Sequence, residues 1–350
     1  MSHILWRYLL GRHINEGNII KIYRLSMFSN LTVSIILLLL REQIVTYIYL
    51  FALYYAFSQC LYWTTYEVMI YELNTKEGFK KYFAYDSMIA NISAIIFPAL
   101  FGMVLNNYSY TVVFGILSVI ALISFILSFT IKDVPIYCQK INLKESKKHI
   151  KNKKLFAYSG LQSVLDGLTN GGVIQMLTTL IIFSKFESEA FMGNVSSIIA
   201  IVCVIVAVFS KKRINKDNFL KIVFPITFLL FIITIPISFH TSLIFVILYK
   251  LCIELCDVLT NIEGNTVTFE CFDDILEEKY KVDYQWFIEL TLATGRAIGL
   301  IAIIILCLAF GNRIEVLMIL FIYFTTFYML RTIVIDKIRK IQRSIEENKK

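Results

Sequence analysis

The sequence is poor in charge and in proline. Only 17% of its 350 residues are charged and 57% are apolar, whereas a soluble globular domain carries about 25% charged residues. This deficit argues against a soluble domain. There are only four prolines, and the apolar and polar residues do not alternate as they do in membrane-spanning strands, which argues against a β-barrel. The remaining class is a polytopic membrane protein built from helices.

Several chemical motifs are also missing. The sequence has no glycine-rich phosphate loop, so we do not expect ATP to drive its activity, and no metal-ligand cluster or nucleophile triad stands out. Its seven cysteines include no CxxC pair. We therefore expect no disulfide, no zinc site, no cofactor and no enzymatic activity.

The charge that is present lies between apolar segments. The formal net charge is +8, and its clustering in loops indicates membrane topology and attraction to an anionic lipid bilayer rather than binding of nucleic acid. Basic loops alternate with short or nearly neutral ones, which places both termini in the cytoplasm of a plasma-membrane protein. The basic loops are 7–24, 76–81, 132–154, 211–221 and the tail from Lys337. Loop 272–283 is net acidic, but acidic residues weigh little in this rule, so we keep it cytoplasmic.

Ten apolar segments predict an all-α polytopic membrane protein with about ten transmembrane helices. The longest basic loop divides the chain into a truncated N-terminal half of about four spans (1–131), a cytoplasmic linker (132–154), a six-helix C-terminal half (155–337) and a tail (338–350). The segments are 25–40, 44–70, 85–105, 109–131, 156–182, 193–209, 219–239, 241–266, 284–309 and 314–335.

An internal repeat supports two pseudo-symmetric halves. Residues 11–22 (GRHINEGNIIKI) match residues 211–222 (KKRINKDNFLKI), and four helices follow each copy. Two helices of its own half precede the second copy, whereas only a fragment precedes the first, so the N-terminal half counts about two helices fewer. The matched positions are Ile14–Asn15 with Ile214–Asn215, Asn18 with Asn218, and Lys21–Ile22 with Lys221–Ile222.

The two halves, the basic central loop and the polar motif between the second and third helix of each half resemble the major facilitator superfamily. The loop motif of that family reads G-x-x-x-D-R-x-G-R-K. Here Gly11, Asn15 and Gly17 fall near it, with Asn15 in place of Asp, Glu16 in place of Arg and a slip of one residue at the second glycine. The resemblance implies helices three to twelve, with 156–182 and 241–266 as the seventh and tenth, which line the central cavity in that family.

The stretch 249–265 (YKLCIELCDVLTNIEGN) is polar inside an apolar segment. Lys250, Glu254, Asp257 and Asn261 lie at i, i+4, i+7 and i+11 and therefore share one helix face. A charge at the bilayer centre costs about 2.5–3.5 kcal/mol, so these groups need each other, water or a substrate. We expect a substrate or proton site here. The alternative is an ion pair that only holds helices together.

Two further segments carry intramembrane charges. Asp166, followed by Gly167 and Asn170, predicts a second cavity acid facing Lys250 or a bound cation; the alternative is an acid bonded to a neighbouring helix, with Gly167, Gly171 and Gly172 serving close packing. Glu289 and Arg296 lie seven residues apart on one face. Arg296 needs an acidic partner among Glu254, Asp257 and Glu289, and structural pairing is favoured over substrate binding.

Segment 44–70 offers an aromatic and amide face made of Gln59, Trp63 and Tyr66, which suits an amphipathic substrate or, alternatively, packing and interfacial anchoring. Glu67 and Glu263 occupy similar places near the cytoplasmic ends of their helices. We expect them, together with the motif residues Gly11, Asn15 and Asn215, to act at the cytoplasmic gate.

The resemblance and these residues together predict a monomeric secondary transporter that works by alternating access. The expected activity is export of a small amphipathic or drug-like solute coupled to protons through Asp257, Glu254 or Asp166. Uptake of a small polar nutrient by the same fold stays open. So does a different class, a non-transporting remnant or membrane assembly partner.

Overall fold

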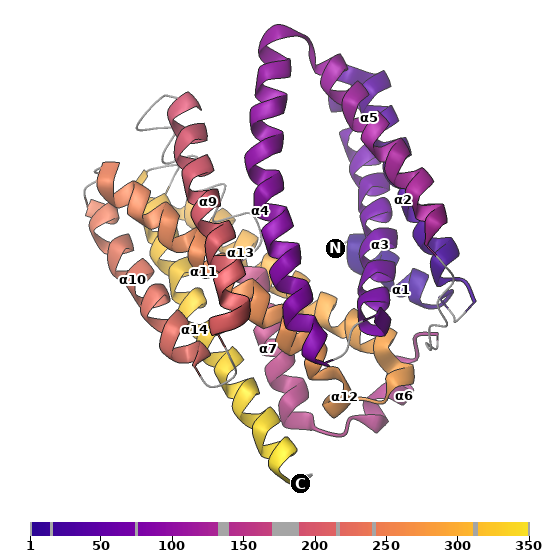
Figure 1. Cartoon of the computed structure of the whole chain (residues 1–350), viewed down its shortest axis with the longest axis vertical. Helices are drawn as coiled ribbons and strands as arrows, with labels where there is room; N and C mark the ends of the chain where they lie inside the picture. The colour runs from indigo at the N-terminus through magenta and orange to yellow at the C-terminus, as the bar shows by residue number, and fades with distance from the viewer. Residues whose placement is uncertain are drawn as a thin grey trace. The chain divides into compact units, whose positions relative to one another are not determined.

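The computed structural model describes residues 2–14, 17–73, 76–131, 140–169, 189–214, 218–239, 243–310 and 314–348 (Figure 1). Within these ranges the chain consists of helices and connecting turns, without a strand. Within the described residues, each of the ten predicted apolar segments overlaps a long helix, with segment 156–182 described only as far as Thr169. The expected all-α architecture is therefore confirmed.

The long helices are α2 (Ile19–Leu40), α3 (Ile48–Leu73), α4 (Lys76–Asn107), α5 (Tyr110–Leu127), α7 (Lys153–Thr169), α9 (Glu189–Arg213), α10 (Phe219–Phe239), α11 (Leu243–Glu270), α13 (Lys281–Phe310) and α14 (Ile314–Asn348). The short helices are α1 (Ser2–Gly11), α6 (Leu143–Ser146) and α12 (Phe272–Ile275).

Four helical stretches in the described part are both long and apolar enough to cross a membrane: Ile19–Leu40, Tyr110–Thr130, Phe219–Pro236 and Glu278–Leu306. Helix α11 has 28 residues, enough to cross about 30 Å of hydrocarbon at 1.5 Å per residue. Polar residues such as Glu254 and Asp257 lower its apolarity. A helix of this length that keeps charges at its centre is the pattern expected of a functional span.

The chain forms two compact units. The first contains Met1–Thr75, Pro98–Lys151 and Leu276–Phe287. In it α2 packs against α3 and α5, and α1 packs against α3. Its apolar core includes the buried side chains Ile14, Ile19, Ile20, Val68 and Val282.

The second unit contains Lys76–Phe97, Asn152–Ile275 and Ile288–Lys350. In it α14 packs against α7, α10 and α11, and α11 also packs against α9 and α10. Helix α14, yellow in Figure 1, is therefore the shared neighbour of three other helices. The predicted boundary at 132–154 stays a prediction, because residues 132–139 lie outside the described part.

The two copies of the sequence repeat have the same local structure. Helix α2 begins directly after Asn18 and helix α10 directly after Asn218. In each copy the asparagine carbonyl accepts the first helical bond, from the Ile22 amide at 2.9 Å and from the Ile222 amide at 3.1 Å. Each copy also buries its isoleucine, Ile14 or Ile214. The repeat is thus a helix-start motif as well as a sequence match.

Two glycines allow α7 and α13 to touch backbone to backbone. A Cβ built on Gly167 would collide with the Leu292 carbonyl oxygen, and one built on Gly295 would collide with the Val164 carbonyl oxygen. Small residues at helix crossings permit this close approach in membrane proteins. The interpretation of Gly167 as a packing residue therefore has a structural basis.

We expect Gly295→Ala to destabilise the protein by about 1–3 kcal/mol, because the methyl group forces the two backbones apart. Gly115→Ala on α5 is the matched control, since nothing lies within 4 Å of a Cβ at Gly115. Thermal unfolding of the purified variants in detergent measures the difference. Equal melting temperatures for the two variants would contradict the close crossing.

Candidate functional site

The polar face of α11 lines a cavity in the second unit. The cavity has a volume of about 320 Å³, which lies within the range of about 300–1,000 Å³ that is usual for small-molecule sites. Two helices form its wall. Of the four predicted residues, Glu254, Asp257 and Asn261 line it. Its lining consists of Phe83, Asp86, Ser87, Ala90 and Asn91 from α4, and Glu254, Asp257, Val258, Asn261, Ile262 and Asn265 from α11.

Both walls follow helical periodicity. The α4 residues recur at i, i+3, i+4, i+7 and i+8 from Phe83, and the α11 residues repeat the same spacing from Glu254. The walls bring together three carboxylates (Asp86, Glu254 and Asp257) with amide and hydroxyl groups, and none of the lining residues in the described part of the chain is Lys, Arg or His. Among the described residues, no group of three or more His, Cys, Asp or Glu is placed to hold a metal ion.

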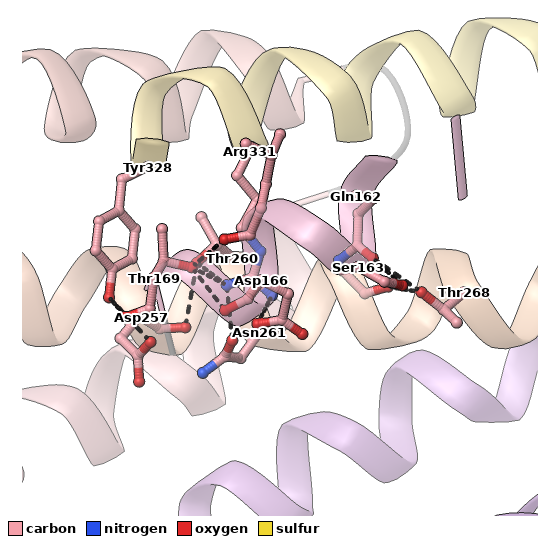
Figure 2. A network of polar contacts seen from close by, with 12 residues as sticks. Gln162, Ser163, Asp166, Thr169, Asp257, Thr260, Asn261, Thr268, Tyr328 and Arg331 are labelled. Carbon is pink, nitrogen blue, oxygen red and sulfur yellow. Dashed lines mark hydrogen bonds and ion pairs between the residues drawn. The ribbon is translucent and has the colours of Figure 1, made fainter. Parts of the chain in front are cut away.

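A buried arginine lies behind this wall. Arg331 of α14 is 0% exposed, and its Nη2 lies 2.8 Å from Oδ1 of Asp166 on α7. The two atoms are within ion-pair distance, although their alignment does not meet hydrogen-bond geometry. The Nη1 of Arg331 donates to Oδ1 of Asn261 on α11 at 3.0 Å. Figure 2 shows that Arg331 thus contacts two helices besides its own.

Two threonines complete the surroundings of Arg331. Its Nη1 lies 3.3 Å from Oγ1 of Thr260 and 3.4 Å from Oγ1 of Thr169. Each hydroxyl donates its proton to a carbonyl one turn back in its own helix, Thr260 to Cys256 at 2.6 Å and Thr169 to Leu165 at 3.0 Å. The oxygen lone pairs therefore face the guanidinium, which is the orientation that a buried cation needs.

Tyr328 connects the same α14 face to Asp257. Its hydroxyl lies 3.3 Å from Oδ1 of Asp257 and 3.3 Å from the carbonyl oxygen of Thr169 (Figure 2). Tyr328 and Arg331 are three residues apart on α14, and Asp257 and Asn261 are four apart on α11. The two cavity residues are therefore held by neighbouring side chains of one helix.

The other predicted charges of this unit have separate partners. Arg296 of α13 is 48% exposed and lies 4.0 Å from Glu289, so among its three predicted partners the structure gives Glu289. Asp166 was expected either to face Lys250 or a bound cation or to bond to a neighbouring helix, and its partner is Arg331 of α14, in line with the second alternative. Lys250 is half-buried on α11 and attracts Glu254 electrostatically across one helical turn.

The predicted aromatic and amide face lies in the first unit. Gln59 on α3 donates to Oδ1 of Asn30 on α2 at 3.5 Å, and Ser58 donates to the same atom at 2.9 Å. The rings of Trp63 and Tyr66 meet edge to face at 5.6 Å, and Trp63 is 44% exposed. These contacts bring the predicted residues together on one helix. They form a group separate from the cavity lining.

The predicted gate residues have basic partners. Glu67 pairs with the buried Arg7 in the first unit. In the second unit Glu263 lies 2.6 Å from Nη2 of Arg339 and 3.4 Å from Nζ of Lys80. Gly11 lies close to Ile141 and Val282, and the Asn15 and Asn215 positions lie outside the described residues, as do Asn170, Gly171 and Gly172.

Sequence reasoning missed Arg331, Tyr328 and the α4 wall. Arg331 stands in an apolar run (YMLRTIVI) where it reads as an ordinary charge at a helix end. For the α4 wall a signal was available, since Asp86, Ser87 and Asn91 share one face of a segment that is otherwise apolar. Nothing in the sequence alone joins that face to α11.

Solved structures of membrane transporters share this fold. The human organic anion transporter MFSD10 (TETRAN) is 12% identical with a TM-score of 0.71, and the match covers 95% of this chain and 81% of that one. A bacterial homologue of the iron transporter ferroportin, in an outward-facing state, is 14% identical with a TM-score of 0.66, covering 96% and 88%. The E. coli fucose:proton symporter FucP is 11% identical with a TM-score of 0.66, covering 95% and 86%.

Identities this low show the common fold and nothing of the cargo. Among curated proteins, no sequence matches the chain. The family model of the Major Facilitator Superfamily matches residues 5–273, which is most of the chain and includes both copies of the helix-start repeat and the cavity lining. The chain therefore belongs to the major facilitator superfamily and is a multi-pass membrane transporter rather than an enzyme.

Proposed function

We propose that this transporter exports a small cationic, amphipathic solute in exchange for protons, by alternating access at the cavity between α4 and α11. The observation that carries the proposal is the lining of that cavity. Three carboxylates, three amides and a hydroxyl face a space of about 320 Å³ whose lining contains no Lys, Arg or His. Such a wall creates a negative potential that attracts a positively charged solute.

The apolar part of the lining supports an amphipathic cargo. Phe83, Val258 and Ile262 lie among the acidic and amide groups. An aromatic or aliphatic portion of a solute gains free energy by leaving water against these side chains, while its positive charge pairs with a carboxylate. The amides of Asn91, Asn261 and Asn265 add hydrogen bonds that orient it.

Competition at one carboxylate supports exchange and hence export. A proton and a cationic solute both bind the ionised form of Asp257, so occupancy by one displaces the other. A transporter that changes between its inward- and outward-facing states with either ligand bound, but not with both, exchanges the two ligands in opposite directions. Because the proton gradient of a plasma membrane points inward, the solute leaves the cell. We place the monomeric protein in that membrane with both termini in the cytoplasm.

Uptake by symport is the second candidate. The cavity holds three carboxylates rather than one, so a proton on one acid and a cation on another can be bound together. Co-binding couples both fluxes in the same direction and leads to import. The sign of the coupled flux separates the two mechanisms.

The cargo class and direction can be tested in proteoliposomes with an acidic interior and the membrane potential clamped by potassium and valinomycin. We expect 1-methyl-4-phenylpyridinium, a permanent aromatic cation, to accumulate inside. Biphenyl-4-sulfonate, which has similar rings and a permanent negative charge, is the matched control and should not accumulate. Transport of the anion would refute the cation site. Cation flux toward the alkaline side would support symport, and flux of neither probe together with one fixed co-purifying protein would support an assembly partner.

We expect Asp257→Asn to reduce proton-driven flux of the cation at least about 100-fold, because the amide binds neither a proton nor a positive charge as a carboxylate does. Asp336→Asn is the matched control. Asp336 is a buried carboxylate on α14 that does not line the cavity, and its partner at 2.6 Å is Lys340, whose side chain is 65% exposed. Wild-type flux in Asp257→Asn would remove this residue from the transport site.

A further inference from the structure

Arg331 and Asp166 stand behind the cavity wall, and the transport site proposed above gives neither of them a role. Arg331 does not line the cavity, yet it binds the cavity residue Asn261 and lies beside the side chain that holds Asp257. A fully buried guanidinium needs a counter-ion, because leaving it unpaired in a low-dielectric interior is strongly unfavourable. Asp166 at 2.8 Å supplies that counter-ion.

We propose that Arg331 is a positioning residue for the transport site, which pairs with Asp166 and leaves Asp257 as the carboxylate that exchanges protons with cargo. This inference rests on the proposed function for the role of Asp257. The pairing gives the two acids different roles. Asp166 is the counter-ion of Arg331, while Asp257 is held by the hydroxyl of Tyr328 and faces the cavity.

The geometry explains why one arginine can affect both acids. Its Nη2 faces Asp166 on α7, and its Nη1 faces Asn261, one helical turn beyond Asp257 on α11. In this position the guanidinium attracts the Asp257 carboxylate electrostatically, although Arg331 itself does not line the cavity. A lysine there could not reach two helices in the same way, because its ammonium is a single point charge rather than a planar fork.

The other charged and titratable groups around Asp257 come from α4, α7, α9, α11 and α14. The charged ones are Glu254 and Lys250 on α11, Asp166 on α7, Asp86 on α4 and Arg331 on α14, and the titratable neutral ones are Tyr328 on α14, Cys203 on α9 and Cys256 on α11. Of these, Arg331 and Asp166 form the only close pair of opposite charges that the described residues place behind the wall. Removing Arg331 therefore makes the electrostatic potential at Asp257 more negative, and removing the charge of Asp166 makes it more positive.

Two single substitutions should shift proton binding at Asp257 in opposite directions. Arg331→Gln removes a positive charge, so protonation of Asp257 should be half complete at a pH higher by about 1–3 units. Asp166→Asn removes a negative charge, so the midpoint should fall. The double variant Arg331→Gln/Asp166→Asn removes both charges and should return close to the wild-type midpoint. Arg331→Lys keeps the charge and should stay nearer to wild type than Arg331→Gln.

The measurement is infrared difference spectroscopy of the full-length purified protein during a pH titration, following the carbonyl absorption of protonated carboxyl groups. Loss of a band in Asp257→Asn assigns that band, and Arg331→Gln in the Asp257→Asn background identifies any contribution from Asp166. This readout needs no cargo. Size-exclusion profiles show whether each variant is folded. Each single variant tests the sign of the shift by itself, so one folded single variant is sufficient, and the double variant is the control in which both charges are absent.

A purely structural Arg331 predicts unchanged midpoints in the folded single variants Arg331→Gln and Asp166→Asn, and that result would overturn the proposal. So would shifts of the same sign in both single variants, or a titration in which Asp257→Asn removes no band. The two proposals fail separately. Opposite shifts of the midpoint without flux of 1-methyl-4-phenylpyridinium would support the positioning role and reject the proposed transport function. Asp257-dependent flux with unchanged midpoints would support the transport function and reject the positioning role.

Discussion

A charge buried among apolar helices needs a partner of opposite sign, and the second unit is arranged around that requirement. Arg331 and Arg339 on α14 are both almost fully buried. Arg331 pairs with Asp166 on α7, and Arg339 pairs with Glu263 and Glu270 on α11. Breaking such a pair by removing one member typically costs about 3–5 kcal/mol. These two arginines therefore hold α14 against α7 and α11 more specifically than apolar contacts alone.

Helix α11 separates its polar residues onto two faces. At about 100° per residue, Glu254, Asp257 and Asn261 point one way, whereas Glu263 and Glu270 point to the opposite side. The first group lines the cavity and the second binds Arg339. The sequence stretch 249–265 therefore contains two polar faces, because Glu263 binds Arg339 of α14 and does not line the cavity.

The sequence was sufficient for everything that depends on helical periodicity. In the described part of the chain each predicted apolar segment overlaps a helix, and the repeat at 11–22 and 211–222 marks equivalent helix starts. The spacing of Glu254, Asp257 and Asn261 placed them on one face. What periodicity cannot give is the partner across a helix interface. The prediction for Asp166 left open Lys250, a bound cation or a neighbouring helix as its partner, and the structure pairs it with Arg331 of the neighbouring helix α14.

Arg331 shows why this limit is physical. An arginine near the end of an apolar run can place its long side chain either in the interface or in the core, and the sequence is the same in both cases. Burial is favourable only where other helices supply an acid and several oxygen acceptors at once, here Asp166, Asn261, Thr169 and Thr260. Those acceptors lie between 70 and 165 residues away in the chain. Their meeting is a property of the folded unit, so the partners of Arg331 become visible only after the helices are packed.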